Sequence, residues 1–342
     1  MKALVLTEVG KFTYKDVPEP TPQRGEVKLR IKAVAICGSD VHGYDGFSGR
    51  RIPPVIIGHE ASGEVVSVGE GVTDFKVGDG VVFNSLRYCG TCWYCQRGLQ
   101  ELCENGCCYG IHTKERNLDG AMCDYLCVPA YLCYHIPEGV SYESAALIEP
   151  LSIAVHAVGG VEIHTGDTAV IFGAGVIGLM LLKVLRTTGC GKLIVVELDE
   201  AKRAMAKANG ADVVLDGKGD VAAQIHEVTC GRGADLAFEA VGIPITMKNA
   251  VNSLRPAGIL VQVGNVAQSV DLPLQTIVMK ELQIRGRCYT SVEYETSLRM
   301  VESGKISLED CISVVAPLTD GQEWFDRLHA QEPGLVRVVL KP

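Results

Sequence analysis

The sequence lacks an excess of positive charge and lacks long hydrophobic segments. Its 342 residues contain 32 Lys and Arg against 41 Asp and Glu, which gives a net charge of −9. Binding to nucleic acid or to an anionic membrane surface depends on basic residues, so the composition argues against both partners. The longest purely apolar run covers residues 169–182, which is too short to cross a bilayer. We therefore expect neither a membrane protein nor a nucleic-acid-binding protein.

The N-terminal residues MKALVLTEVGKFTYKD also lack the pattern of an export signal, because their apolar stretch is short and broken by Thr, Glu and Gly. This favours a cytoplasmic protein. Proline is scarce relative to glycine, 14 against 38, which is typical of tight turns and of backbone that approaches ligands closely. Hydrophobic residues make up 47% and the length suits about two domains, so packed cores are expected.

The character of the sequence changes near residue 150. Residues 1–150 read as short strands separated by Gly and Pro, which predicts a β-rich, barrel-like domain. In residues 151–285 strands alternate with helix-forming segments, which predicts a doubly wound parallel sheet. Residues 286–342 read as a helix followed by a final strand. The predicted fold class is therefore α/β with a separate β-rich domain.

A dinucleotide-binding fingerprint of the form G-x-G-x-x-G follows the first strand of the second domain and opens a helix. Its residues are Gly173, Ala174, Gly175, Val176, Ile177 and Gly178. The glycines permit a tight turn, close approach of a pyrophosphate, and packing of the helix on the strand. Glu197 closes the next strand, where it can bind ribose hydroxyls and repel a 2′-phosphate, so NAD is the predicted cofactor. The alternative is a plain strand–helix turn.

Four closely spaced cysteines predict a metal loop: Cys89, Cys92, Cys95 and Cys103. Four thiolates complete a tetrahedral zinc shell, which makes such a site structural. An iron–sulfur cluster or unliganded thiols are the alternatives, and Cys107 could replace Cys103. The other nearby cysteines are expected to be buried as small hydrophobic side chains: Cys107, Cys108, Cys123, Cys127 and Cys133.

A second set of potential metal ligands is dispersed along the first domain: Cys37, His59, Glu60 and Glu149. One sulfur, one nitrogen and one or two oxygens suit a zinc ion with an open position. Ser39 and His42 follow Cys37 closely enough to handle a proton beside it. Their spacing in the sequence does not establish that these groups converge.

Together these motifs resemble the zinc-dependent medium-chain alcohol dehydrogenase family, and within it the polyol (sorbitol and galactitol-phosphate) dehydrogenase branch. The resemblance rests on GHE at residues 58–60 with the glycines after it, on CGSDVH at 37–42, on the four-Cys loop, on the segment from Glu149, and on the glycine fingerprint. It implies a GroES-like catalytic domain over residues 1–150, a Rossmann NAD-binding domain over 151–285, and a return to the catalytic domain over 286–342.

The resemblance also implies roles for individual residues. It implies two Zn²⁺ per chain: a structural ion in the four-Cys loop and a catalytic ion bound by Cys37, His59 and either Glu149 or Glu60. It places Ser39 and His42 in a proton relay, and Glu197 with Lys202 at the adenosine ribose. The residues expected near the substrate entrance are Tyr44, Phe47, Tyr109 and His112.

The expected activity is the reversible, NAD-dependent oxidation of a secondary hydroxyl of a polyol or polyol phosphate to the ketose. Oxidation of L-threonine at C3 or of 2,3-butanediol is the alternative, because Gly43 stands where sorbitol dehydrogenases often have an aromatic residue. A zinc-free quinone reductase or a non-catalytic nucleotide sensor would not need both metal sets. A homodimer or homotetramer is expected.

Overall fold

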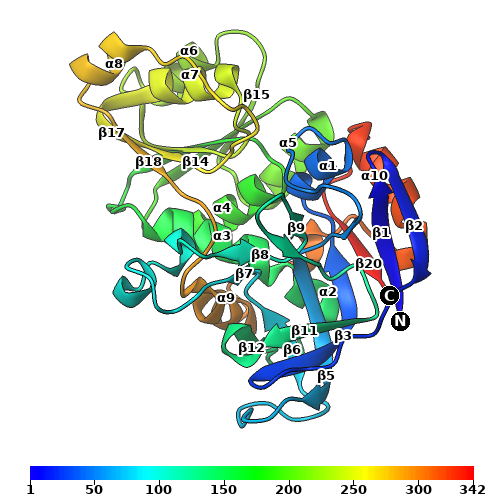
Figure 1. Cartoon of the computed structure of the whole chain (residues 1–342). Helices are drawn as coiled ribbons and strands as arrows, with labels where there is room; N and C mark the ends of the chain where they lie inside the picture. Colours follow the sequence, from blue (N-terminus) through cyan, green and yellow to red (C-terminus); the bar gives the residue numbers. More distant parts are fainter. The chain divides into compact units, whose positions relative to one another are not determined.

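The computed structural model describes residues 1–342 and divides them into two compact units. Unit 1 contains Met1–Ser152 and Thr290–Pro342, and unit 2 contains Ile153–Tyr289. The chain therefore starts in unit 1, forms unit 2, and then returns to complete unit 1 (Figure 1). None of the helices has the length and apolar character needed to cross a membrane.

Unit 1 is built mainly from antiparallel strands, with a seven-stranded sheet in the order β12-β6-β5-β3-β20-β19 and with β11 also paired to β3. A three-stranded sheet, β2-β1-β4, and two short ribbons complete it. Its strands are β1 (Lys2–Glu8), β2 (Lys11–Asp16), β3 (Glu26–Ala35), β4 (Val55–Ile56), β5 (Glu60–Val68), β6 (Gly80–Phe83), β7 (Leu86–Arg87), β8 (Cys107–Cys108), β9 (Ile111–His112), β10 (Asn117–Leu118), β11 (Tyr125–Pro129), β12 (Cys133–His135), β19 (Val314–Pro317) and β20 (Val338–Lys341).

Strand β3 shows why these residues form a half-buried sheet. Val27, Leu29 and Ile31 are buried, while Lys28 and Arg30 between them are more exposed. This alternation matches the two-residue period of a strand with one face on the core. The register of β3 against β5 is thereby fixed, and this pairing later positions two of the candidate metal ligands.

The helices of unit 1 are short and lie between or after the strands: α1 (Gly38–Tyr44), α2 (Tyr142–Ala146), α9 (Glu293–Glu302) and α10 (Gly321–His329). Helix α3 (Ile148–Gly159) runs across the boundary between the units. Five 3₁₀ turns cover Cys95–Arg97, Gln100–Leu102, Ala130–Leu132, Glu309–Cys311 and Leu318–Asp320. The sequence indicated α9 and β20 but not α10 or β19, and it gave no sign that α3 begins before residue 150.

Unit 2 contains one six-stranded sheet in the order β15-β14-β13-β16-β17-β18, and every ladder in it is parallel. Its strands are β13 (Thr168–Phe172), β14 (Lys192–Glu197), β15 (Val213–Asp216), β16 (Ala234–Glu239), β17 (Leu254–Gln262) and β18 (Gln283–Gly286). Its helices are α4 (Val176–Arg186), α5 (Glu200–Ala208), α6 (Val221–Val228), α7 (Pro244–Ser253) and α8 (Leu274–Met279).

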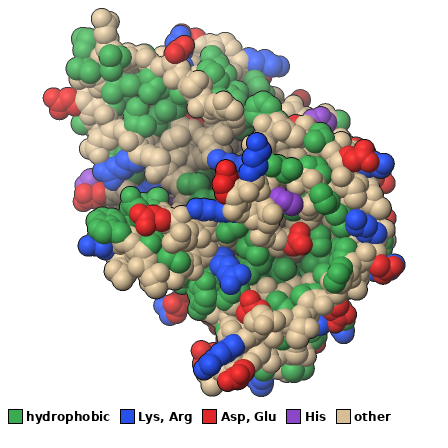
Figure 2. Space-filling model, viewed as in Figure 1, with side chains coloured by type: hydrophobic (Ala, Val, Ile, Leu, Met, Phe, Trp, Pro, Cys, Tyr) green, Lys and Arg blue, Asp and Glu red, His purple; other side chains and the backbone are tan.

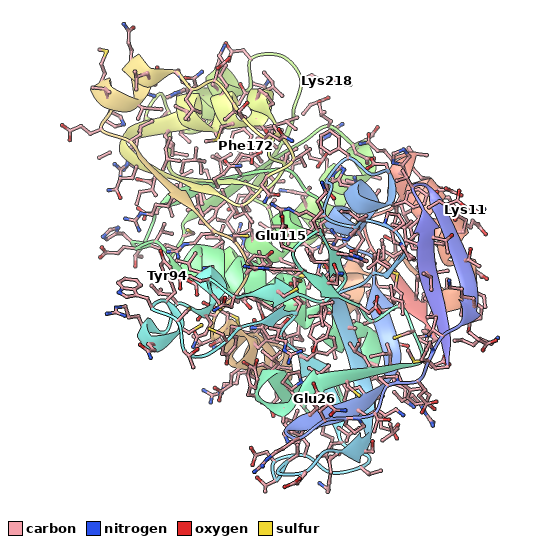
Figure 3. The ribbon with its side chains drawn as sticks, viewed as in Figure 1. Lys11, Glu26, Tyr94, Glu115, Phe172 and Lys218 are labelled. Atoms are coloured by element: carbon pink, nitrogen blue, oxygen red, sulfur yellow. The ribbon has the colours of Figure 1, made fainter.

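Counted within unit 2, this strand order is 3-2-1-4-5-6, the order of the Rossmann fold. The central strands are buried on both faces, so they read as continuous apolar runs; Phe172, labelled in Figure 3, ends β13 and is fully buried. The order in which successive strands are added to the sheet reverses between β13 and β16. In folds of this kind, ligands bind outside the carboxyl ends of the strands at that point. The predicted fold class, α/β with a β-rich first domain, is confirmed.

Candidate metal centres and dinucleotide site

Three potential metal ligands from the dispersed set come together in unit 1. The ligand atoms of Cys37, His59 and Glu60 all lie within 4.8 Å of one another. His59 and Glu60 are buried, with 7% and 1% of their surface exposed, and Cys37 is partly exposed. The cluster is therefore a largely buried donor set that is partly accessible at Cys37, not a group of surface side chains.

The pairing of β3 with β5 explains how residues more than 20 positions apart meet. Ala35 at the end of β3 is the register partner of Glu60 at the start of β5. Cys37 lies just beyond the end of one strand, and His59 lies just before the start of the other. Because the strands are antiparallel, both side chains reach the same end of the sheet.

Burial and mutual charge control protonation in this cluster. Burial favours the neutral thiol of Cys37, but the charge and hydrogen bond of His59 outweigh it and lower the pKa of Cys37 to about 5. The pKa of His59 is lowered by burial and raised by Asp40 and Cys37, with a net value well above its ordinary range. Burial raises the pKa of Glu60 well above its ordinary range. The cluster thus holds a thiolate beside an imidazolium: the thiolate can bind a metal ion directly, and the imidazolium releases its proton when its nitrogen binds one.

Glu149 lies near this cluster but is not one of the three residues that meet within 4.8 Å. Its carboxylate accepts a 3.1 Å hydrogen bond from the Ser85 hydroxyl. Burial raises the pKa of Glu149 to about 7, against the opposing charge of His59. In this structure Glu60, not Glu149, is the carboxylate grouped with the Cys and His ligands.

The chemistry of the donor set fits zinc. A thiolate, an imidazole and a carboxylate are the ligand types that zinc combines in catalytic sites, with a fourth position left open. Glu60 Oε1 is buried without a hydrogen-bond partner, which is the condition expected of a ligand atom reserved for a cation. The residues present therefore fit a catalytic zinc ion.

A buried arginine that the sequence analysis did not identify holds the other oxygen of Glu60. Arg337 Nη1 lies 2.8 Å from Glu60 Oε2 and also donates to the carbonyl of Ile36. Both side chains of the ion pair are at most 3% exposed. The sequence did contain an indication of a buried arginine, because Arg337 interrupts the apolar strand pattern LVRVVLK. It did not identify the partner, because Glu60 lies far away in the sequence.

Helix α1 presents the predicted proton-relay residues. Ser39 and His42 are three positions apart, so they share one face of the helix, with Ser39 exposed and His42 partly exposed. Asp40, the residue after Ser39, is fully buried and accepts a 3.1 Å hydrogen bond from the Cys37 backbone N–H. The helix thus separates an accessible hydroxyl and imidazole from a buried carboxylate.

The four-Cys loop forms the second cluster. The sulfur atoms of Cys89, Cys92, Cys95 and Cys103 all lie within 4.8 Å of one another, and none forms a disulfide. The backbone N–H groups of Cys89 and Cys92 donate to sulfur atoms across the loop, each at 3.3 Å. Such bonds lower the pKa of Cys89 to about 5, with the backbone at Thr91 as the main cause. The donor set is closed and all-sulfur, which fits structural zinc.

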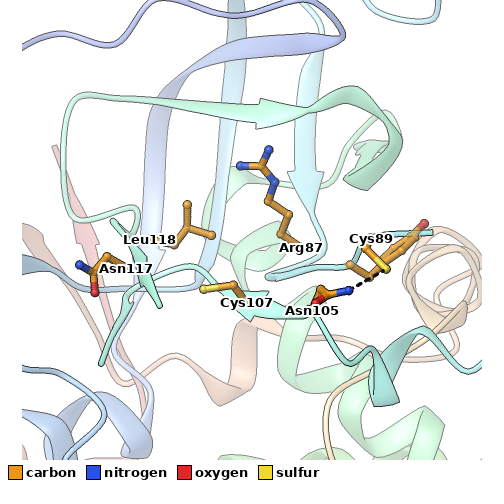
Figure 4. Close-up of a pocket in the computed structure, with 7 residues that line it drawn as sticks. Arg87, Cys89, Asn105, Cys107, Asn117 and Leu118 are labelled. Atoms are coloured by element: carbon orange, nitrogen blue, oxygen red, sulfur yellow. Dashed lines mark hydrogen bonds between the residues drawn. The ribbon is translucent and has the colours of Figure 1, made fainter. Parts of the chain in front are cut away.

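Cys107 is not part of the four-sulfur cluster. It is partly exposed and lines a cavity of about 310 Å³ beside the loop, shown in Figure 4. Asn105 in the same cavity donates a 3.7 Å hydrogen bond to Cys89 Sγ, drawn as a dashed line. Three of the other neighbouring cysteines are buried, as expected: Cys108, Cys123 and Cys133. Cys127 is partly exposed, as Cys107 is.

The glycine fingerprint lies between β13 and α4 in unit 2. Gly173 has a φ of +96°, and a Cβ there would lie 2.7 Å from a methyl group of Val241. A Cβ on Gly178 would lie 1.9 Å from the carbonyl oxygen of Gly173, so the helix packs against the turn itself. Gly175 caps α4 and faces open space, which leaves its backbone accessible to a phosphate.

Glu197 fastens the glycine-rich loop to the end of β14. One carboxylate oxygen accepts a 2.7 Å hydrogen bond from the backbone N–H of Ala174. The other accepts from the backbone N–H groups of Leu198 and Asp199 at 2.7 and 3.0 Å. Lys202 lies in the first turn of α5, directly after this point. The carboxylate is partly exposed and placed at the carboxyl edge of the sheet, where a dinucleotide binds in this fold.

Two of the residues expected near the substrate entrance belong to the core instead. Tyr44 is 5% exposed, packs on Phe12 and Phe325, and donates its hydroxyl to the carbonyl of Gly10. Tyr109 is 1% exposed within the same hydrophobic core. A substrate cannot reach these hydroxyls, and we leave both residues out of the pocket.

The other two expected pocket residues remain accessible. Phe47 is largely exposed, and its ring centre lies 6.2 Å from that of His42. His112 is partly exposed, and its Nδ1 lies 3.0 Å from the carbonyl of Pro54. Phe47 is thus next to the relay histidine, and His112 keeps one ring nitrogen free of that contact.

Comparison with known proteins agrees with this architecture. Residues 23–138 match the alcohol dehydrogenase GroES-like domain, and residues 176–303 match the zinc-binding dehydrogenase family. The sorbitol dehydrogenase of Halalkalibacterium halodurans is 34% identical over 100% of this chain and 99% of its own. The crystal structure of 2R,3R-butanediol dehydrogenase from Bacillus subtilis has a TM-score of 0.89 and 31% identity, covering 100% of this chain and 99% of that one.

A third solved structure, galactitol-1-phosphate dehydrogenase from Escherichia coli, has a TM-score of 0.91 and 27% identity, with complete coverage of both chains. The two-unit fold, the two metal-ligand clusters and the full-length similarity to known dehydrogenases define the class of this protein. The chain belongs to the zinc-dependent medium-chain dehydrogenase family, among relatives that include polyol dehydrogenases. It is an oxidoreductase with a nucleotide cofactor.

Proposed function

We propose that this enzyme oxidises a secondary hydroxyl of a polyol or polyol phosphate to the ketose, reversibly and with NAD⁺. The observation that carries the proposal is the convergence of Cys37, His59 and Glu60 beside the helix that presents Ser39 and His42. Full-length similarity to a sorbitol dehydrogenase and to a galactitol-1-phosphate dehydrogenase supports the polyol substrate class.

We propose two zinc ions per chain. Cys37, His59 and Glu60 would hold the catalytic ion, with Glu149, whose carboxylate feels the charges of His59 and Cys37, as the alternative ligand, and the four-Cys loop would hold the structural ion. When bound, the catalytic zinc supplies a Lewis acid that makes a substrate hydroxyl more acidic. NAD⁺ supplies the hydride acceptor.

The chain's own residues then manage the proton and the cofactor. The Ser39 hydroxyl accepts the substrate hydroxyl proton while its own proton moves towards His42, whose imidazole exchanges with solvent. In unit 2 the backbone around Gly175 and the N-terminus of α4 receive the pyrophosphate. Glu197 and Lys202 bind the adenosine ribose, and the Glu197 charge selects against NADP⁺.

We also propose which segments form each domain: residues 1–150 and 286–342 form the catalytic domain, and residues 151–285 form the domain that binds NAD. The four thiols of the metal loop have to stay reduced to bind zinc, which supports a cytoplasmic location.

A homodimer or homotetramer is supported by apolar side chains at one edge of unit 2. Leu274, Val278 and Met279 on α8 are 65–84% exposed, and α8 directly precedes the edge strand β18 in the chain. Figure 2 shows hydrophobic side chains gathered over the part of the molecule that carries α8 in Figure 1. A second copy of the chain would cover these side chains and the open strand edge.

Oxidation of 2,3-butanediol or L-threonine is the second candidate, supported by the similarity to 2R,3R-butanediol dehydrogenase. The deciding experiment is an initial-rate screen with NAD⁺ across sorbitol, xylitol, galactitol and their phosphates, L-threonine, 2,3-butanediol and ethanol, combined with metal analysis. We expect two zinc ions per chain and the highest kcat/KM for a polyol or polyol phosphate. A tenfold or greater preference for ethanol, butanediol or threonine would exclude the polyol assignment.

A further inference from the structure

A buried arginine lies beneath helix α1, beside the proposed relay serine. Arg51 is 4% exposed, and its Nε and Nη2 donate to Asp40 Oδ1 at 3.0 and 2.7 Å. The same Nη2 donates to Ser39 Oγ at 3.2 Å. One guanidinium group therefore holds a buried carboxylate and an accessible hydroxyl from two adjacent positions of the helix.

Asp40 connects this arginine to the catalytic metal ligands. Its Oδ2 accepts the hydrogen bond from the Cys37 backbone N–H, and its Oδ1 lies 3.3 Å from His59 Nδ1. Partners of this kind fix the orientation of metal-binding side chains. Because Asp40 is fully buried, its charge needs the fixed positive charge of Arg51 beside it.

The space for Arg51 comes from Gly43. A Cβ at this position would lie 2.1 Å from Arg51 Cδ and 2.9 Å from its Cγ. The φ of Gly43 is not in the left-handed region, so close contact with the arginine stem, not backbone conformation, requires the glycine. The residue after His42 is therefore a glycine because any larger residue would collide with the Arg51 side chain.

The backbone of Arg51 is held as firmly as its side chain. The two residues that flank Arg51 form backbone hydrogen bonds with His112. The Ile52 N–H donates to the His112 carbonyl at 2.9 Å, and the His112 N–H donates to the Arg50 carbonyl at 3.0 Å. The guanidinium therefore has little freedom to leave α1.

The contact with Ser39 has a consequence for proton transfer. A serine hydroxyl has two lone pairs and one O–H, whereas a guanidinium can only donate. When Arg51 occupies one lone pair, the hydroxyl keeps one lone pair to accept a proton and one O–H to release one. It can then act as a relay in a single orientation, and its protonation is unchanged after each transfer.

We infer that Arg51 is a positioning residue, which orients the Ser39 hydroxyl for proton transfer and Asp40 against the metal ligands, with Gly43 providing its space. The inference rests on the proposed zinc-dependent oxidation. No contact of Arg51 with substrate or cofactor is needed.

The first test is a double-mutant cycle on the purified enzyme with its best substrate. Arg51→Lys keeps a charge near Asp40 but ends in one nitrogen, which cannot hold both partners. We expect kcat to fall by about 10- to 100-fold with KM nearly unchanged. In the Ser39→Ala background, Arg51→Lys should change kcat by less than twofold, because residues that act as a unit are non-additive. The exposed neighbour Arg50→Lys is the matched control and should change nothing.

Gly43→Ala provides an independent perturbation, since the added methyl group displaces the arginine stem without removing its charge. It should lower kcat in the same way as Arg51→Lys. Equal losses from Arg51→Lys with and without Ser39, or no loss from Arg51→Lys, would overturn the relay role.

A second test does not depend on turnover. Zinc affinity is measured by chelator competition for wild type, Arg51→Met and the control Arg50→Met. We expect Arg51→Met to weaken the catalytic zinc by about 10- to 100-fold and to leave the structural zinc in place. Unchanged affinity would overturn the role through Asp40; if Arg51→Met does not fold, Gly43→Ala takes its place. Failure of the proposed function would instead appear as a wild-type enzyme that binds zinc but produces no NADH from any alcohol.

Discussion

Arg337 and Glu60 form an ion pair with 2.8 Å between Nη1 and Oε2, and both side chains are almost completely buried. Removing one partner of such a pair leaves an uncompensated charge in the protein interior. We predict that Arg337→Met lowers the free energy of unfolding by about 3–5 kcal/mol, measured by urea denaturation at fixed zinc concentration. The double variant Arg337→Met/Glu60→Gln should recover part of this loss. A single variant as stable as wild type would contradict the prediction.

The two cysteine sites should respond differently to substitution. Cys92→Ser opens a closed four-sulfur shell, so we predict loss of one zinc ion per chain and a lower yield of folded protein. Metal analysis and thermal unfolding measure both effects.

Cys37→Ser removes a ligand from the more open cluster. We predict an intact fold, retention of the structural zinc, and a kcat reduced by at least about 100-fold. Activity assays and circular dichroism on the same preparation test this, and a near-wild-type kcat would show that Cys37 is not a catalytic ligand.

Glu197 should determine cofactor choice. We predict a higher kcat/KM for NAD⁺ than for NADP⁺, because the carboxylate repels a 2′-phosphate. Glu197→Gln keeps an acceptor for the Ala174 N–H but loses the charge, so the preference should fall by about tenfold, which corresponds to about 1.4 kcal/mol. Asp199→Asn, at the cap of α5, is the charge-matched control. A wild-type preference for NADP⁺ would refute the assignment.

Asp235 should link the stability of unit 2 to pH. Its buried carboxylate accepts from the Thr168 N–H and pairs with Arg255 and Arg232. Burial raises its pKa, but these partners outweigh that effect and the net pKa is below its ordinary value. A depressed pKa in the folded state means that the carboxylate stabilises the fold above about pH 4, the unfolded value, and that this contribution is lost as the pH falls through the folded value.

Asp235→Asn should therefore lower the unfolding free energy by about 2 kcal/mol at pH 7, with a smaller difference below pH 4. Urea denaturation from pH 3 to 7 measures this. Asp16→Asn is the control, because Asp16 pairs with Lys2 on the surface, where an ion pair contributes little. A difference that is constant across the pH range would contradict the linkage.

Local patterns in the sequence were sufficient to predict the positions of the glycine fingerprint and of the four-Cys loop. Gly173 and Gly178 act within one turn, and the loop cysteines lie within 15 residues, so chain connectivity alone brings them together. The meeting of Cys37 with His59 depends on the register of β3 and β5, which the sequence does not state. The resemblance to a family supplied that information.

Other features depended on partners that are distant in the sequence. Arg337 meets Glu60 only because β20 pairs with β3, and no local pattern assigns an arginine to a buried partner. Tyr44 and Tyr109 were expected near the substrate entrance because the family resemblance implied it. The core of unit 1 uses their large apolar rings instead, and this choice depends on tertiary packing.

The return of the chain to unit 1 sets an order of events during synthesis on the ribosome. All of unit 2 is translated before β20 and Arg337 emerge, so the Rossmann sheet can form while the catalytic unit still lacks a strand and the partner of Glu60. A nascent chain therefore has its structural cysteines early, but it completes the surroundings of the catalytic ligands only near termination. Premature stop codons between Tyr289 and Arg337 would leave a complete unit 2 attached to an incomplete metal centre.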